Sequence, residues 1–374
     1  MKNLISSAFL LAEIFCISTS MHAQDQITGA IHIQNPLTIS GYVDTYYSYD
    51  FGAPANHERP SFFYSYNKHN ELNLNLGFVK AKYTQPGRVR GNLALMAGTY
   101  AQYNLSSEQG LLKNVFEANV GACVYDNNEQ NIWVDAGIMP SHIGFESAIG
   151  KDCWNLTRSM LADNSPYYES GIKVGYATSD DKWYIAAMYL NGWQRITKIN
   201  GNQTPAFGMQ VTFKPPHSDM TFNWSTYIGN EQPDSAALRR LFNNFYGIVQ
   251  LSDKVGLTAG FDIGLQQKNK DSSDMNLWYS PVVIVQYNVT NSLRFAARAE
   301  YYSDPNGVII PTGTSNGFQT LGYSLNVDYY PGVSQDVLFR AEIRSLQSKD
   351  DVFIANNKLS TANTFFTTSF SLAF

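Results

Sequence analysis

The sequence predicts an all-β fold: a transmembrane antiparallel β-barrel of about sixteen strands, with short periplasmic turns and long outer loops. Three observations lead to this prediction. Apolar and polar residues alternate along many short segments, aromatic residues are abundant, and no stretch after the N-terminal region reaches the ~20 apolar residues that a membrane helix requires. In lipid, a closed barrel is the only other structure that satisfies all its backbone hydrogen bonds internally.

The composition supports a membrane barrel over an ordinary soluble domain. Aromatic residues make up 14% of the chain, with 24 Tyr and 22 Phe. Charged residues make up only 15%, well below the ~25% of typical soluble domains. The modest net charge of −5 argues against nucleic-acid binding. A secreted soluble β-protein is the alternative that composition alone leaves open.

The N-terminal region has the features of an export signal. Lys2 precedes an apolar run, and small and polar residues then lead to Ala23. This pattern predicts a secretory signal peptide at 1–23, removed after export. We expect a short periplasmic segment at 24–35 and one outer-membrane barrel at 36–374.

The last segment of the chain shows the strand pattern most clearly. One face is largely apolar, with Phe366, Thr368, Phe370, Leu372 and Phe374. The other is small and mostly polar, with Thr367, Ser369, Ser371 and Ala373. The first face suits hydrocarbon and the second a narrow, wet interior. We expect this strand to close the barrel by pairing with the segment around 41–49.

The same period-two alternation recurs along the chain. Strands are predicted to begin near residues 36, 70, 88, 113, 130, 167, 181, 205, 217, 240, 254, 275, 292, 316, 336 and 361. In the segment near 113, we expect Phe116, Ala118, Val120, Ala122 and Val124 to face lipid. Connections alternate strictly between long and short, as expected when loops lie at one end of a barrel and turns at the other.

The longest connection, 140–166, is a candidate pore constriction. Irregular backbone is tolerated inside a barrel where it lines water, and charged groups at a constriction set ion preference. The candidate residues are Glu146, Lys151, Asp152, Arg158 and Asp163. The alternative is a mobile external loop that plays no part in the pore.

A second candidate is a charged ladder on strands near the C-terminus. By parity its members face inward: Arg294, Arg298, Glu300, Arg340, Glu342 and Arg344. A charge facing lipid would cost about 2–4 kcal/mol near the membrane midplane, which supports the inward direction. Arg rings favour anions. The alternative is that the paired charges brace the wall without selecting solutes.

Other chemistry has little support. Cys123 and Cys153 could form a disulfide in an exported protein, and the sequence leaves that open. Ser141 and His142 suggest a barrel-embedded hydrolase only weakly, because no nucleophile elbow accompanies them. We find no metal-ligand spacing and no cofactor motif, so we expect no catalytic residue, metal or cofactor.

Several stretches resemble the OmpL-like β-barrel porins of Gram-negative bacteria. They are GYVDTYYSY at 41–49, DAGIMP at 135–140, GFES at 144–147, NSPYYESG at 164–171, LNGW at 190–193 and RAEYYSD at 298–304. Each is weakly specific alone, and their order along the chain is more convincing. The resemblance implies a general porin or solute channel, and it assigns no functional residue.

The leading functional interpretation is a passive channel for small hydrophilic solutes, because a barrel of about sixteen strands leaves an aqueous lumen. The expected partners are outer-membrane lipid and the solutes themselves, and a homo-oligomer is left open. A structural or adhesive barrel whose outer loops bind a ligand is the alternative, ahead of the hydrolase.

Overall fold

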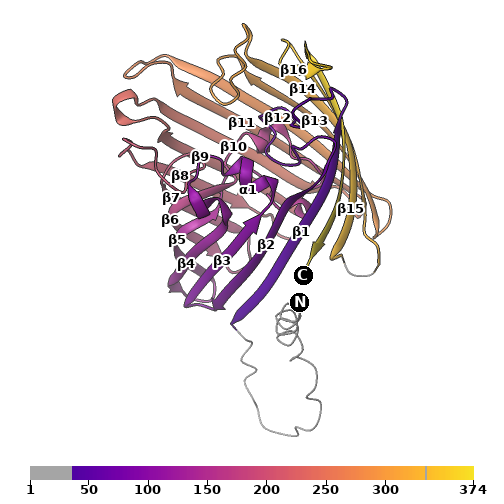
Figure 1. Cartoon of the computed structure of the whole chain (residues 1–374). Coiled ribbons are helices and arrows are strands. Elements are labelled where there is room, and N and C mark those ends of the chain that lie inside the picture. Colours follow the sequence, from indigo (N-terminus) through magenta and orange to yellow (C-terminus); the bar gives the residue numbers. More distant parts are fainter. Residues whose placement is uncertain (1–35, 333–334) are drawn as a thin grey trace, which may run out of the picture. The chain divides into compact units, whose positions relative to one another are not determined.

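The structure, a computed structural model, describes residues 36–332 and 335–374. The predicted signal peptide at 1–23 and the segment at 24–35 lie outside the described residues. Within the described part, sixteen strands form one closed antiparallel barrel (Figure 1). The fold class predicted from the alternation is therefore confirmed.

The first eight barrel strands are β1 (Leu37–Asp50), β2 (Leu72–Gln85), β3 (Val89–Ala97), β4 (Val115–Asp126), β5 (Gln130–Pro140), β6 (Tyr168–Thr178), β7 (Trp183–Leu190) and β8 (Ala206–Phe213). The second eight are β9 (Met220–Asn230), β10 (Arg239–Gln250), β11 (Val255–Gln267), β12 (Met275–Asn288), β13 (Leu293–Asp304), β14 (Phe318–Tyr329), β15 (Val337–Ser348) and β18 (Ala362–Ala373). Each predicted start lies within three residues of an observed one; the largest difference is at β9, predicted near 217 and beginning at Met220.

The two faces of the wall differ as the alternation predicts. On β13, Phe295 is 46% exposed on the outer face, whereas Arg298 is 2% exposed on the inner face. Large apolar side chains cover the outside of every strand pair in the same way. This apolar surface belongs against lipid, because exposing it to water would cost roughly 25 cal/mol per Å².

The barrel closes between its first and last strands. β1 and β18 pair antiparallel, with Tyr42 opposite Ala373 and Asp50 opposite Phe365. The chain end extends this seam, because the Gly41 amide donates to the Phe374 carbonyl at 2.8 Å. A Cβ at Gly41 would come within 2.3 Å of the Phe374 ring, so the glycine leaves room for the terminal aromatic.

The connections contain short elements that the sequence did not predict. They are the helices α1 (Thr99–Asn104) and α2 (Met160–Asp163), the 3₁₀ turns η1 (Gly110–Asn114), η2 (Gly150–Asp152) and η3 (Asp234–Ala236), and the hairpin β16 (Phe353–Ala355) with β17 (Lys358–Ser360). Each is too short to produce a periodic pattern of its own. Among the described residues, no helix is long and apolar enough to span a membrane.

One predicted orientation is wrong. Phe116 was expected to face lipid, but its ring stacks on inward-facing Phe78 with centroids 4.9 Å apart. The cause is a shift in the β3–β4 register between Ala94 and Leu95, which pairs Leu95 with Val115. The irregularity leaves Phe116 out of the ladder and turns it to the interior, as β-bulges do.

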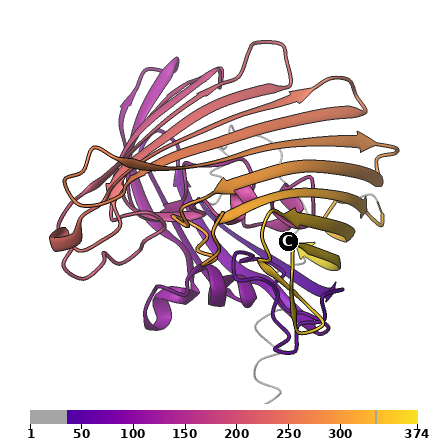
Figure 2. The same ribbon diagram turned by 90° about the horizontal axis from the view of Figure 1, so that it is seen from above.

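Two long connections occupy much of the interior. The segment between β1 and β2 places Phe62 and Phe63 in a buried aromatic cluster with Phe318, Phe353 and Phe365. The segment between β5 and β6 also lies inside the ring of strands, as the view from above shows (Figure 2). The remaining free space is therefore set by where these segments are fixed.

Candidate functional site

The connection between β5 and β6, residues 141–167, is fixed to the inner wall by its own backbone. The amides of Leu156, Thr157 and Met160 donate to inward-facing side chains. Their acceptors are Asn326 on β14 at 3.0 Å, Glu342 on β15 at 2.6 Å and Glu300 on β13 at 2.6 Å. We call residues 141–167 the inner segment.

Three arginines of the predicted ladder hold the inner segment by its carbonyl groups. Arg298 donates to the Thr157 carbonyl at 2.7 Å. Arg340 donates to the Gly150 carbonyl at 2.6 Å, and Arg344 to the Arg158 carbonyl at 2.8 Å. Loop carbonyls without regular structure need such donors when water is excluded.

The charges of these arginines are balanced within the wall. Arg298 pairs with Glu342 at 2.9 Å, Arg344 with Glu300 at 2.6 Å, and Arg340 with Asp328 at 2.7 Å. All six side chains are nearly or fully buried. The inner segment thus covers this part of the ladder. Arg294 alone remains half-buried, with its guanidinium over the Tyr330 ring.

Glycines on β8 and β11 make room for the bulky side chains of the inner segment. A Cβ at Gly208 on β8 would lie 2.6 Å from the His142 ring, and one at Gly260 on β11 would lie 2.6 Å from the Phe145 ring. A Cβ at Gly256 on β11 would lie 2.6 Å from the Trp154 ring. The wall is therefore shaped for these side chains.

His142 anchors the start of the inner segment. Its Nδ1 lies 2.8 Å from a Glu169 carboxylate oxygen and its Nε2 lies 2.8 Å from the Thr226 carbonyl. A carboxylate and a carbonyl both accept hydrogen bonds, so the protonated ring can donate to both partners at once. Burial alone would lower the pKa of His142, but the Glu169 carboxylate outweighs this and raises it.

Ser141 and His142, the weak hydrolase alternative, form hydrogen bonds with other groups and not with each other. Ser141 uses its hydroxyl to accept the Ile143 amide at 3.1 Å. Both ring nitrogens of His142 lie against other groups, the Glu169 carboxylate and the Thr226 carbonyl. The two side chains serve the conformation of the inner segment.

The five predicted constriction residues differ in accessibility. Glu146, Arg158 and Asp163 are buried, Lys151 is half-buried and Asp152 is exposed. Arg158 donates to the carbonyls of Ser147 at 2.6 Å and Leu156 at 2.7 Å, which braces the inner segment internally. Burial raises the pKa of Asp163 to about 7. A role in ion preference stays a prediction for all five.

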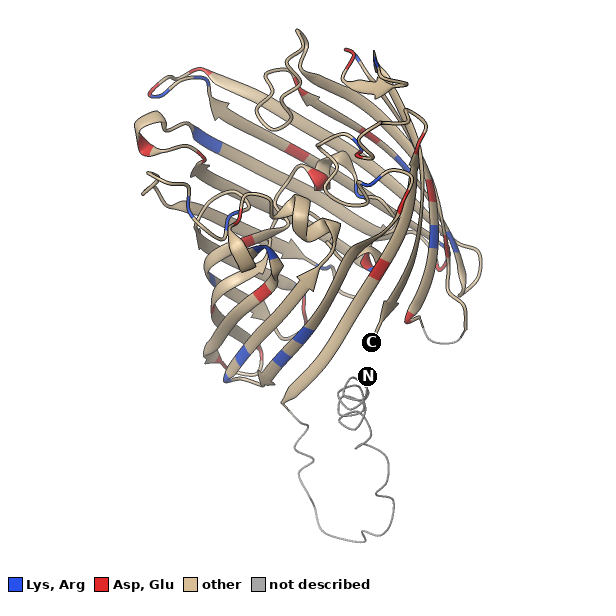
Figure 3. Ribbon diagram, viewed as in Figure 1, with Lys and Arg blue, Asp and Glu red and all other residues tan. Residues whose placement is uncertain are grey.

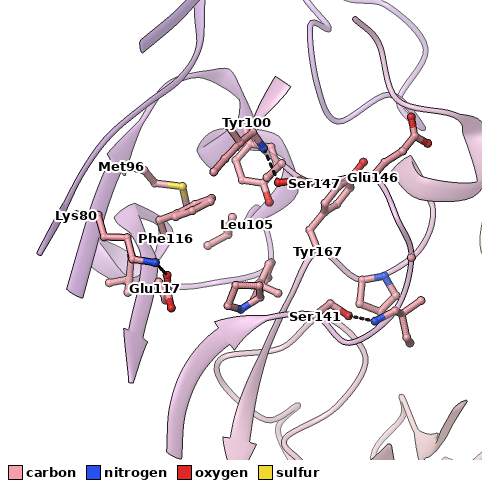
Figure 4. A pocket seen from close by; sticks show the side chains of 18 of the residues that line it. Lys80, Met96, Tyr100, Leu105, Phe116, Glu117, Ser141, Glu146, Ser147 and Tyr167 are labelled. Atoms are coloured by element: carbon pink, nitrogen blue, oxygen red, sulfur yellow. Dashed lines mark hydrogen bonds and ion pairs between the residues drawn. The ribbon is translucent and has the colours of Figure 1, made fainter. Parts of the chain in front are cut away.

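A cleft of about 270 Å³ separates the inner segment from the wall formed by β2, β3 and β4 (Figure 4). Lys80 and Glu117 lie on its wall side as an ion pair with 2.5 Å between Nζ and Oε2. The lining combines aromatic and polar groups, among them Met96, Tyr100, Phe116, Ser147 and Tyr167. The sequence does not predict this cleft, because the cleft forms between segments that lie far apart in the chain.

The cysteines are both free thiols. Cys153 lies buried in the inner segment and donates to the Ser147 carbonyl, whereas Cys123 on β4 donates to the Tyr125 carbonyl. The disulfide that the sequence left open is absent from the structure.

A closed sixteen-stranded barrel with an apolar outer face and a segment folded into its lumen is the architecture of an outer-membrane porin. The family comparison agrees with that class. Residues 36–374 match the family described as putative β-barrel porin-2, OmpL-like, and the chain belongs to this family. The resemblance noted in the sequence is thereby confirmed, and no curated protein sequence matches the chain.

Several solved structures share the fold at low sequence identity. The anion-selective porin from Comamonas acidovorans is 11% identical, with a TM-score of 0.58 over 90% of this chain and 99% of the porin. Salmonella typhi OmpF, solved with daunomycin, is 11% identical, with a TM-score of 0.57 over 90% and 97%. The trimer form of Vibrio cholerae OmpT is 10% identical, with a TM-score of 0.55 over 90% and 99%. At these identities the likeness shows the fold.

Proposed function

We propose that this porin lets small hydrophilic solutes diffuse passively across the outer membrane, and that the cleft beside the inner segment forms the narrowest part of the path. One observation carries the proposal: the inner segment is fixed against β13, β14 and β15, while a cleft remains between it and β2, β3 and β4. The inner segment also bonds β9 and β10, through the Thr226 carbonyl and the Asn244 side chain, so the space beside β2, β3 and β4 is left for the passage.

The chemistry of the lining supports this route. The cleft offers polar groups for hydrated solutes, including the Lys80–Glu117 pair and Ser147, between aromatic faces. The wall behind the inner segment offers no such path, because its arginines are already bonded to carbonyl groups and carboxylates.

Removing Phe116 tests the proposed route. Its half-buried ring lines the cleft, so Phe116→Ala should widen the passage without breaking an ion pair or hydrogen bond. In liposome-swelling assays with sugars of increasing size, we expect the variant to admit larger sugars faster than the wild type. An unchanged size limit would contradict a passage along this cleft.

Phe295→Ala is the matched control, because it removes the same ring from the lipid face of β13. We expect it to leave the size limit unchanged. If both variants changed the limit equally, general loosening of the barrel would be the cause.

We also propose that the protein is exported by a signal peptide and assembles into a homo-oligomer. The pattern at 1–23 supports export through a cleavable signal peptide. Assembly into a homo-oligomer is supported by the fold shared with the OmpT trimer form. Lys151 and Asp152, the charged residues of the inner segment that keep exposure, would tune the ion preference.

A further inference from the structure

Among the inward-facing charged residues of the strands, the carboxylates are buried and several of the cations are exposed to solvent. Within the described strands, the inward-facing carboxylates short of the turns are all buried: Asp44, Asp50, Glu117, Asp135, Glu169, Asp262, Glu300, Asp304, Asp328 and Glu342. Five inward-facing cations keep access to solvent: Lys80, Lys82, Arg90, Lys173 and Arg294. We call these five residues the inner cations.

The strand register and the exposure of neighbouring side chains show which way the lysines of β2 point. Lys82 pairs with Asn92, and Asn92 donates to Asn119 within the interior. The neighbours of Lys80 and Lys82 on the other face, Val79 and Tyr83, are exposed large apolar side chains. Because successive residues of a strand point to opposite faces, the lysines face the lumen.

Where an inner cation has a carboxylate partner, the carboxylate lies beneath it. The Lys80 side chain is 25% exposed over Glu117 at 8%, and Arg90 is 35% exposed over Asp135 at 4%. Lys173 approaches the same Asp135 at 4.0 Å. A passing ion therefore meets ammonium and guanidinium groups first.

Four of the five lie in the half of their strand that leads to a short turn, and Lys173 is the central residue of β6. Basic residues accordingly mark the short-turn ends of β2 and β3 (Figure 3). Asp126, the exposed last residue of β4, belongs to the turn and accepts the Asn128 amide at 3.0 Å. The inner cations therefore extend from the cleft, which Lys80 lines, toward the short-turn end of the barrel.

We infer that the channel prefers small anions and that the inner cations set this preference. The inference rests on the proposed function. Charge of one sign along a low-dielectric passage raises the local concentration of ions of the opposite sign. Arg298, Arg340 and Arg344 are not the source, since the inner segment and neighbouring carboxylates cover them.

The test is the reversal potential of the full barrel in a planar bilayer under a potassium chloride gradient. The wild type should pass chloride better than potassium. Lys82→Glu reverses an exposed charge that has no ion-pair partner among the described residues, so the fold should survive. We expect the chloride-to-potassium permeability ratio to fall by about twofold or more.

Lys254→Glu is the control, because it makes the same change of net charge in an exposed turn. It should leave the ratio close to that of the wild type. A conducting wild type without chloride preference would overturn the inference and leave the proposed function intact, as would a Lys82→Glu variant with the wild-type ratio. A folded barrel that passes no current would overturn the proposed function itself.

Discussion

At the residue scale, Arg298 links the wall to the inner segment. It contacts Glu300 at 3.2 Å and Glu342 at 2.9 Å, and it donates to the Thr157 carbonyl at 2.7 Å. Glu146 of the inner segment lies 3.9 Å away. One buried cation thus lies against carboxylates from two strands and from the inner segment.

Removal of this cation should destabilise the protein. Arg298→Ala would leave Glu300 and Glu342 buried with less compensation, and breaking a buried ion pair in this way costs about 3–5 kcal/mol. We expect a lower unfolding midpoint in heat-modifiable electrophoretic mobility. Arg88→Ala, at an exposed turn residue, should change stability by no more than about 0.5 kcal/mol. Equal midpoints for the two variants would contradict the role of Arg298.

His142 predicts a dependence on pH. Its pKa is raised above the ordinary value of 6.5, so the charged contact with Glu169 stabilises the fold fully below that value. The contribution is lost as the pH rises through the raised pKa. We expect the unfolding midpoint of the wild type to fall on the alkaline side more steeply than that of His142→Gln. Parallel pH profiles would contradict a raised pKa of His142 in the folded protein.

The parity of the strand residues predicted these side-chain directions well. Arg298, Arg340 and Arg344 face inward, as the cost of a charge in lipid requires. Alternation carries no information about what covers an inward-facing residue. That depends on the fold of residues 141–167, which has no periodic pattern.

At the element scale, the inner segment is held by complementary shape as well as by charge. Glycines on β8 and β11 leave the space that His142, Trp154 and Phe145 fill. The sequence predicted the position of the connection but not its contacts, because glycines within a strand are compatible with many partners. The orientation of Phe116 was missed for a related reason, since a register shift is set by strand pairing.

Filling one of these spaces should loosen the inner segment. Gly260→Val would place side-chain atoms where the Phe145 ring lies, within 2.6 Å of the new Cβ. We expect faster hydrogen–deuterium exchange of the amides at 141–149. Ala259→Val makes a similar change on the exposed face of the same strand and should leave this exchange unaltered. Equal exchange in the two variants would mean that the glycine does not position the segment.

At the scale of the whole molecule, the structure joins a closed wall to an asymmetric interior. The alternating pattern determines the wall, so strand number, order and closure at Phe374 could all be predicted. The asymmetry arises because β13, β14 and β15 bind the inner segment, whereas β2, β3 and β4 border the cleft. Contacts between distant segments produce it, and no local pattern predicts them.

We expect this barrel to be a water-filled channel that the inner segment narrows. Single-channel recording of the purified full barrel in a planar bilayer tests it most directly. Heat-modifiable mobility would first establish that the barrel is folded. We expect discrete current steps that grow linearly with voltage and become larger in Phe116→Ala. A folded barrel that inserts into the bilayer and shows no current steps would contradict the claim.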